Sequence, residues 1–188
     1  IYDCPKESLI ACEEIYLDEL FTPPVLAAGG VVVKANFPRT YVDVNRAAND
    51  MDPLLFDLPW PDPVDENGRS PHGFGVIMRL IRAGVPIYTH PLSHAEARER
   101  IYRFYHAYHQ TLIDFFDILY KKHKKIYHLN VHSMPSAVVM ANFPHAPPDI
   151  ILGDRDGRSC GLSVRNAVAD SFRSMGYRVA INQLYKGA

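Results

Sequence analysis

Polar side chains that could do chemistry stand where several apolar, strand-like runs of this chain end. The clearest such run is Ile126–Val131, which stops abruptly at His132. Because parallel strands end at one edge of an open sheet, where such sheets bind ligands, we expect these polar residues to converge. The residues at the three strand ends are Asp43, Asn45 and Arg46; His132 and Ser133; and Gly153 and Asp154.

This set of residue types suits a metal-assisted hydrolase that acts on an acidic substrate. A neutral histidine and a carboxylate can hold zinc, and bound zinc lowers the pKa of a water ligand to about 7. An arginine can hold a substrate carboxylate through two parallel hydrogen bonds. Two alternatives stay open. His132 could be an ordinary histidine in a turn, and a serine hydrolase would need a nucleophile elbow that we do not expect here.

The elements that must position these residues are short strands alternating with amphipathic helices. A first helix is expected over Glu7–Phe21, ended by Pro23 and Pro24. The longest helix begins at Ser93, where Glu96 completes a capping box. The expected central strands are Val31–Ala35, Ile126–Val131, Ile150–Leu152 and Arg178–Ile181.

Other segments carry weaker signals. Residues 47–72 lack periodicity, and so long a loop is either functional or disordered. A hairpin of two extended runs, Gly75–Leu80 and Val85–Thr89, is expected around Gly84. A last helix is expected from about Leu162 to Met175, with Gly176 as its C-cap. The expected buried face of the longest helix is Ile101, Phe104, Tyr108, Leu112, Phe115 and Leu119. The same helix carries side chains that either line a site or only pack, namely Tyr105, His106, Tyr108 and His109.

Length and composition indicate one α/β domain. The 188 residues, 47% of them hydrophobic and 22% charged, suffice for one packed core. The net charge of −1 does not show the positive charge typical of proteins that bind nucleic acid. No apolar run approaches the ~20 residues of a membrane span. Three cysteines without zinc-finger spacing suggest a reducing, cytoplasmic setting. We expect residues 1–188 to form a single domain with a central, mostly parallel or mixed sheet and helices on both faces.

Several motifs in this order and spacing resemble the N-formylglutamate amidohydrolase family, although each is weak by itself. The resemblance covers nearly the whole chain. It implies a fold similar to zinc carboxypeptidases, of the phosphorylase/hydrolase-like kind, and cleavage of N-acylated acidic amino acids such as N-formylglutamate, as in the related aspartoacylases. The motifs are Tyr16–Phe21, Phe37–Arg46, Tyr108–His109, Asn130–Met134, Ile151–Asp154 and Tyr185–Gly187.

The resemblance also implies roles for single residues. His132 matches the family's histidine ligand to a metal, and Glu14 stands where the family has an acidic ligand, so a divalent ion such as zinc is the expected cofactor. Arg46 ends an Asp-x-Asn-Arg motif whose arginine binds the carboxylate and the transition state in the similar aspartoacylases. The expected substrate-binding residues are Asn45, Arg46, Ser133 and Lys186, with Arg46 also catalytic.

Two departures from the family pattern stand out. The family has Pro-His-Ser-Gly, with a further histidine ligand, where this chain has Pro5 followed by Lys6. The family's general-base glutamate lies beyond the Lys-Gly motif, and this sequence ends at Ala188. We expect further residues at both places, with a spatial gap between Pro5 and Lys6. The alternative is an inactive family member, or a protein that binds a small carboxylate. The expected partner is a small N-acyl amino acid, with neither nucleic acid nor membrane.

Overall fold

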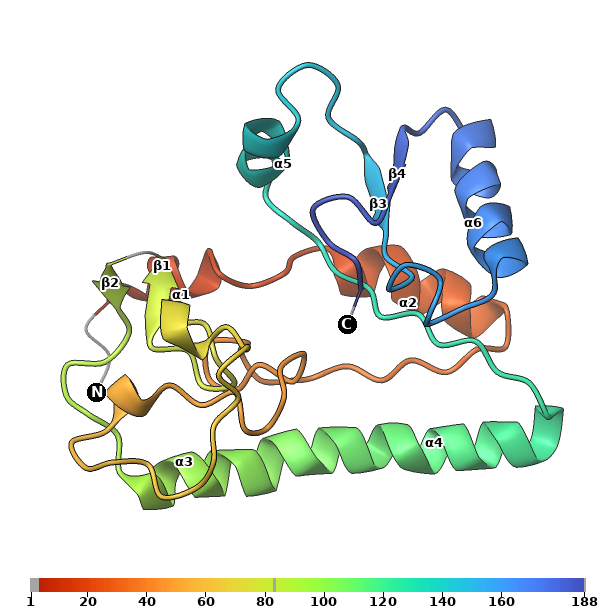
Figure 1. The fold of residues 1–188 in the computed structure, drawn as a ribbon. Helices are drawn as coiled ribbons and strands as arrows, with labels where there is room; N and C mark the ends of the chain where they lie inside the picture. Colours follow the sequence, from red (N-terminus) through yellow and green to blue (C-terminus); the bar gives the residue numbers. More distant parts are fainter. Residues whose placement is uncertain (1–3, 83, 188) are drawn as a thin grey trace. The chain divides into compact units, whose positions relative to one another are not determined.

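The computed structural model describes residues 4–82 and 84–187. The chain divides into two compact units, Ile1–Leu129 and Asn130–Ala188, and each is considered by itself (Figure 1). Both units contain helices and short strands, so the α/β class expected from the sequence is confirmed at that level.

The chain runs without a break into its first helix, α1 (Lys6–Ile10). Pro5 is the N-cap, and its carbonyl accepts a hydrogen bond from the amide of Ser8 at 3.0 Å. The spatial gap expected between Pro5 and Lys6 is therefore absent. The additional residues expected at this junction and after Ala188 stay a prediction.

The expected helix over Glu7–Phe21 is in fact two helices. α1 ends at Ile10, and α2 (Leu17–Ala27) begins after Tyr16, which adopts a left-handed φ of 67°. Pro23 and Pro24 lie inside α2, so the expectation that they end a helix is wrong. A proline has no amide hydrogen, so each removes a helical hydrogen bond to the carbonyl four residues earlier. The residues that carry these carbonyls are exposed, and water can bond to them instead.

The long segment expected to be functional or disordered, residues 47–72, supplies three buried core residues of the first unit, Met51, Leu55 and Phe56. It contains two 3₁₀ turns, η1 (Pro53–Leu55) and η2 (Ser70–His72). Trp60 anchors it, as a ring stacked on Phe56 with centroids 4.8 Å apart. Burial of its apolar side chains orders this loop, although its sequence has no periodicity from which the order could be predicted. The buried core residues are Val42, Met51, Leu55, Phe56, Val76, Ile77, Leu92 and Ala97.

The buried carboxylate of Asp50 holds the two ends of this loop together. Its oxygens accept hydrogen bonds from the amides of Ser70 at 2.8 Å and Arg69 at 2.9 Å. The chain passes so close that a Cβ added at Gly68 would lie 2.1 Å from the carboxylate, and one at Gly75 would lie 2.3 Å from the Asp50 carbonyl. The loop can therefore close only with glycine at both positions.

The longest helix begins where the sequence predicts it, and a hairpin forms around Gly84, but its first strand begins only at Leu80, where the expected run ends. β1 (Leu80–Arg82) and β2 (Val85–Pro86) pair antiparallel. The Ser93 hydroxyl accepts a hydrogen bond from the amide of Glu96 at 3.1 Å and caps α3 (His94–Arg100). The helix continues through η3 (Ile101–His106), which is π-helical, into α4 (Ala107–His123) (Figure 1). Its expected apolar face is the partly buried side of the helix.

The second unit contains a parallel pair of strands and two helices. β3 (Ile150–Leu152) and β4 (Val179–Ile181) pair with Ile151 opposite Ala180. α5 (Ser136–Asn142) precedes β3, and α6 (Leu162–Ser174) connects the two strands and packs beside both (Figure 1). Gly176 follows α6 with a φ of +91°, as its expected C-cap role requires.

Two of the four expected central strands are not formed. Val31–Ala35 and Ile126–Val131 are irregular, and strand pairing in the described chain is confined to two separate two-stranded sheets. Apolar, β-branched composition predicts only a propensity, whereas a strand also needs the hydrogen bonds of a neighbouring strand. His132 therefore does not follow a strand here. Among the described residues, no helix combines the length and apolar character needed to cross a membrane.

Asp149 and Arg178 join the starts of β3 and β4. The guanidinium donates to both carboxylate oxygens at 2.9 and 3.0 Å, and the Arg178 amide donates to Asp149 at 2.8 Å. The hydrogen bonds from the Arg178 side chain and backbone lower the pKa of Asp149 to about 2. A carboxylate with a depressed pKa stabilises the folded state above its unfolded pKa, and that contribution is lost as the pH falls through the folded value.

We therefore expect Asp149→Asn to lower the urea midpoint slightly at pH 7, and the difference from the wild type to shrink between pH 4 and pH 2. The effect is small because the pair is exposed. Asp170→Asn, which removes an exposed helical pair, is the control. A carboxyl ¹³C titration by NMR gives the pKa directly, and an ordinary value for Asp149 would contradict this account.

Candidate active site

The buried carboxylate of Asp43 organises the segment that carries Asn45 and Arg46. Asp43 is 3% exposed, and it accepts a hydrogen bond from Arg39 Nε at 2.9 Å and lies 3.6 Å from Arg46 Nε. Its second oxygen accepts from the amide of Asn45 at 3.0 Å, which closes a tight turn. The structure therefore brings Asp43, Asn45 and Arg46 together, as the sequence predicts.

Arg39 links this turn to the expected metal ligand Glu14. Its guanidinium donates to Glu14 and to Asp43, while its amide donates to Glu13 at 3.2 Å. Burial by itself would lower the pKa of Arg39, but the charges of Asp43 and Glu14 raise it above its ordinary value. Arg39 escaped the sequence analysis, although its place four residues before Asp43 is a spacing that pairs opposite charges.

The Arg46 guanidinium is fixed along one edge. Its Nε donates to the carbonyl of Phe74 at 3.0 Å, and Nη1 makes a long 3.5 Å contact with the carbonyl of Asn45. Within the part of the chain that the structure describes, Nη2 has no hydrogen-bond partner. The outer end of the guanidinium can therefore offer donors to a ligand carboxylate.

The helix side chains that could line a site include two that contact this segment. The Tyr105 hydroxyl donates to the carbonyl of Arg46 at 2.8 Å, and His109 Nε2 lies 3.0 Å from the carbonyl of Val44. Tyr108, by contrast, lines a shallow hollow beside Phe37. Tyr105 and His109 thus belong to the site segment, and aromatic packing alone does not describe them.

A second buried carboxylate, Asp154, follows β3 in the other unit. Asn182, which follows β4, donates to it at 2.6 Å, and Arg165 lies 3.1 Å away. The Asn182 side chain, the Gly157 amide and Arg165 together lower the pKa of Asp154. The ends of β3 and β4 therefore meet at Asp154. Sequence reasoning missed Asn182 because it named no polar residue after the last expected strand, Arg178–Ile181.

Lys186 is held at the surface of the same unit. Its ammonium lies 2.8 Å from Asp156, and its carbonyl accepts from the amide of Arg155 at 2.6 Å. The chain here runs so close to the end of β3 that a Cβ added at Gly153 would lie 2.3 Å from the amide of Gly187. The substrate-binding role expected for Lys186 stays a prediction.

The expected metal ligands are divided between the two units. Glu14 lies in the first, paired with Arg39, and His132 lies exposed in the second, in the irregular segment before α5, followed by the half-buried Ser133. Within residues 4–82 and 84–187, no three His, Cys, Asp or Glu side chains gather as a metal site requires. The metal-binding roles expected for Glu14 and His132 stay predictions.

The serine-hydrolase alternative is weakened by the geometry of Ser159. The expectation that the sequence lacks the motif of a nucleophile elbow is wrong, because Gly157–Gly161 reads Gly-Arg-Ser-Cys-Gly. The elbow requires the serine on a strained turn directly after a strand. Ser159 instead lies well beyond the last residue of β3, is exposed and has no positive φ.

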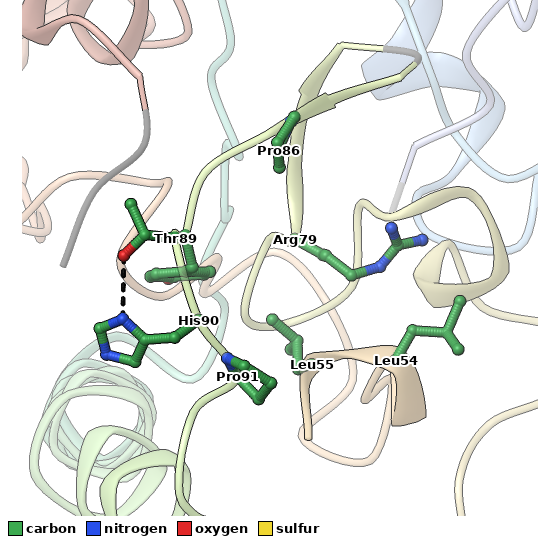
Figure 2. A pocket seen from close by; sticks show the side chains of 8 residues that line it. Leu54, Leu55, Arg79, Pro86, Thr89, His90 and Pro91 are labelled. Atoms are coloured by element: carbon green, nitrogen blue, oxygen red, sulfur yellow. Dashed lines mark hydrogen bonds between the residues drawn. The ribbon is translucent and has the colours of Figure 1, made fainter. Parts of the chain in front are cut away.

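A pocket of about 240 Å³ lies elsewhere in the first unit, between η1 and the segment after β2 (Figure 2). Arg79 lines it and donates through Nε to the buried Asp52 at 2.6 Å. Leu54, Leu55 and Pro91 form an apolar side, and His90 bonds to Thr89 at 2.9 Å (Figure 2). None of the residues expected in the site lines this pocket.

Comparison with known proteins supports the resemblance seen in the sequence. The family model described as N-formylglutamate amidohydrolase matches residues 2–188. Among solved structures, the chain is similar to a crystal structure of N-formylglutamate amidohydrolase from Ralstonia eutropha JMP134. The two share 35% identity with a TM-score of 0.93, over 100% of this chain and 68% of that chain. No curated protein sequence matches the chain.

The matched family defines the class as hydrolases that cleave a C–N amide bond. The chain belongs to the N-formylglutamate amidohydrolase family, because the match extends over nearly its whole length. The resemblance read from the motifs is confirmed.

We expect Asp43→Asn to lower the free energy of unfolding by roughly 2–3 kcal/mol, because it leaves two arginines without their shared carboxylate. Both arginines reach solvent, which keeps the cost at the low end. The matched control is Asp62→Asn, which breaks the exposed pair with Arg98 and should cost less than ~1 kcal/mol. Urea unfolding measures both, and equal costs would show that Asp43 does not organise the turn.

Proposed function

We propose that the protein hydrolyses the amide bond of N-formylglutamate or a closely related N-acyl acidic amino acid. The observation that carries this proposal is the arrangement of Arg46. Its Nε donates to the carbonyl of Phe74, while its Nη2 has no hydrogen-bond partner among the described residues. Such a guanidinium matches a carboxylate, and family membership supplies the amide-cleaving class.

In this proposal Arg46 binds a substrate carboxylate and stabilises negative charge that develops on the acyl oxygen. Asn45 and Lys186 add hydrogen bonds to the substrate, and Ser133 orients the neighbouring His132. Each role comes from the family motif and from the residue's chemistry. The general base would be a glutamate outside residues 1–188, as the family pattern implies.

A divalent ion, with zinc as our first choice, is part of the proposal. Glu14 and His132 would hold it, with a further ligand from outside the described residues. When bound, such an ion polarises the acyl oxygen and activates water. The Arg39 guanidinium supports the role of Glu14, because carboxylates that bind metals usually accept hydrogen bonds from neighbouring side chains.

We further propose that β3 and β4 belong to a larger, mostly parallel sheet of the zinc-carboxypeptidase type. Parallel sheets occur almost only as several strands covered by helices on both faces, and a single pair is marginal by itself. The parallel register of β3 and β4 and the packing of α6 beside both support this.

A second candidate function is binding of a small carboxylate without catalysis. The observation that favours it is the direct Pro5–Lys6 junction, where the family pattern has a further histidine ligand. Turnover and metal content separate the two functions.

Arg46→Lys should lower kcat/KM for N-formylglutamate at least about tenfold, which corresponds to ~1.4 kcal/mol, because lysine lacks the planar fork. Formate release measures turnover. Arg103→Lys, which alters an exposed arginine in the same unit, should leave turnover unchanged. Wild-type-like turnover by Arg46→Lys would remove Arg46 from its role, and a wild type that binds but does not cleave would favour the second function.

Elemental analysis of the full-length protein should find about one zinc-class ion per chain, and His132→Ala should lose it because few ligands remain. His123→Ala, at the exposed end of α4, should keep the ion. Stoichiometric metal retained in His132→Ala would make the assignment of this ligand untenable.

A further inference from the structure

Two side chains of the longest helix hold the backbone on either side of Asn45. The Tyr105 hydroxyl donates to the carbonyl of Arg46 at 2.8 Å, and His109 Nε2 bonds to the carbonyl of Val44 at 3.0 Å. Because a carbonyl can only accept, Nε2 carries the hydrogen of His109. The turn that carries Asn45 is thus fastened at both of its neighbours.

The two hydrogen bonds come from neighbouring side chains on one face of the helix. Tyr105 and His109 are four residues apart, which puts them on the same face, and their ring centroids lie 4.3 Å apart at 39°. Tyr105 stands in η3 and His109 in α4, so the pair spans the point where the π-helical turn ends. π turns inside α-helices recur at functional sites.

The opposite side of the same turn is held by Asp43. Its carboxylate accepts from the Asn45 amide at 3.0 Å, and its carbonyl accepts from the Arg46 amide at 3.2 Å. The backbone of Arg46 is therefore bound through both its amide and its carbonyl, while its Nε is bound to Phe74. The direction in which the guanidinium leaves the chain is set by these contacts together.

Tyr105 is suited to remain a donor. Burial raises the pKa of Tyr105, and the charge of Asp43 raises it further, against a smaller lowering by the Ala48 backbone. The hydroxyl therefore stays protonated throughout the range in which an amide hydrolase would be assayed.

We propose that Tyr105 and His109 are positioning residues for Arg46: they act through the backbone of residues 44–46 to aim the guanidinium at the substrate carboxylate. This inference rests on the proposed function, and it adds two residues that touch neither the substrate nor the reacting atoms. The competing explanation is that both side chains only stabilise the fold.

The test uses Tyr105→Phe and His109→Phe in the full-length protein. Each keeps a ring of similar size and removes one hydrogen-bond donor. Tyr102→Phe is the matched control, because Tyr102 lies in the same π turn with 76% of its surface exposed. Measurements are the melting temperature, KM and kcat for N-formylglutamate, and hydrogen exchange at the Asn45 and Arg46 amides.

We expect each variant to raise KM by threefold to tenfold and also to lower kcat, per folded molecule, because Arg46 both binds the substrate and stabilises the transition state in the proposed function. Exchange at the Asn45 and Arg46 amides should accelerate at least threefold more than at amides of α3. His109→Gln, which keeps a side-chain donor, should recover part of the KM change. Tyr102→Phe should match the wild type throughout.

Unchanged KM and exchange in both variants, or losses that follow only the melting temperature, would overturn the proposal and leave a structural role. If the wild type does not cleave N-formylglutamate, the proposed function fails independently. The exchange comparison still decides the inference in that case, since unaltered exchange at Asn45 and Arg46 would show that Tyr105 and His109 do not hold this turn.

Discussion

A carboxylate that water cannot reach must find its hydrogen bonds within the protein, and Asp43 finds them in the segment it belongs to. Its contacts with Arg39, Arg46 and the Asn45 amide close the turn and fix the position of the Arg46 backbone and Nε. Arg39 extends the same network to Glu14. The candidate site of the first unit therefore has its geometry because one negative charge is buried and must be compensated.

The same solution recurs at the other buried aspartates. Asp50, Asp52 and Asp154 are each 2% exposed, and each accepts a backbone amide: from Ser70 in the first case, from Leu54 in the second and from Gly157 in the third. Buried polar groups of this kind order loops that have little regular structure. In both units, hydrogen bonds from backbone amides to buried aspartates thus hold the loops in place. In a larger sheet, hydrogen bonds between strands would do much of this.

Sequence reasoning predicted what depends on local signals. The Ser93 cap, the glycine-centred hairpin and β3 with β4 follow from patterns of a few residues, and the cluster of Asp43, Asn45 and Arg46 follows from a short motif. It failed where the outcome depends on distant partners. Val31–Ala35 and Ile126–Val131 have strand composition without a neighbouring strand, and Pro23 and Pro24 sit in a helix whose exposure tolerates them. The order of the 47–72 loop and the role of Tyr105 depend on burial that no local pattern reports.

The fastening of the 44–46 turn to the long helix also orders events in time. Its two hydrogen bonds join residues 59 and 65 positions apart, whereas the helix itself is built from contacts four residues apart. Closing so large a loop costs chain entropy before any contact offsets that cost. We therefore expect such contacts to form late in folding and to open early in unfolding. We therefore expect the arginine turn to form on a helix that already exists, and partial unfolding to disrupt the site while most of the helical signal survives.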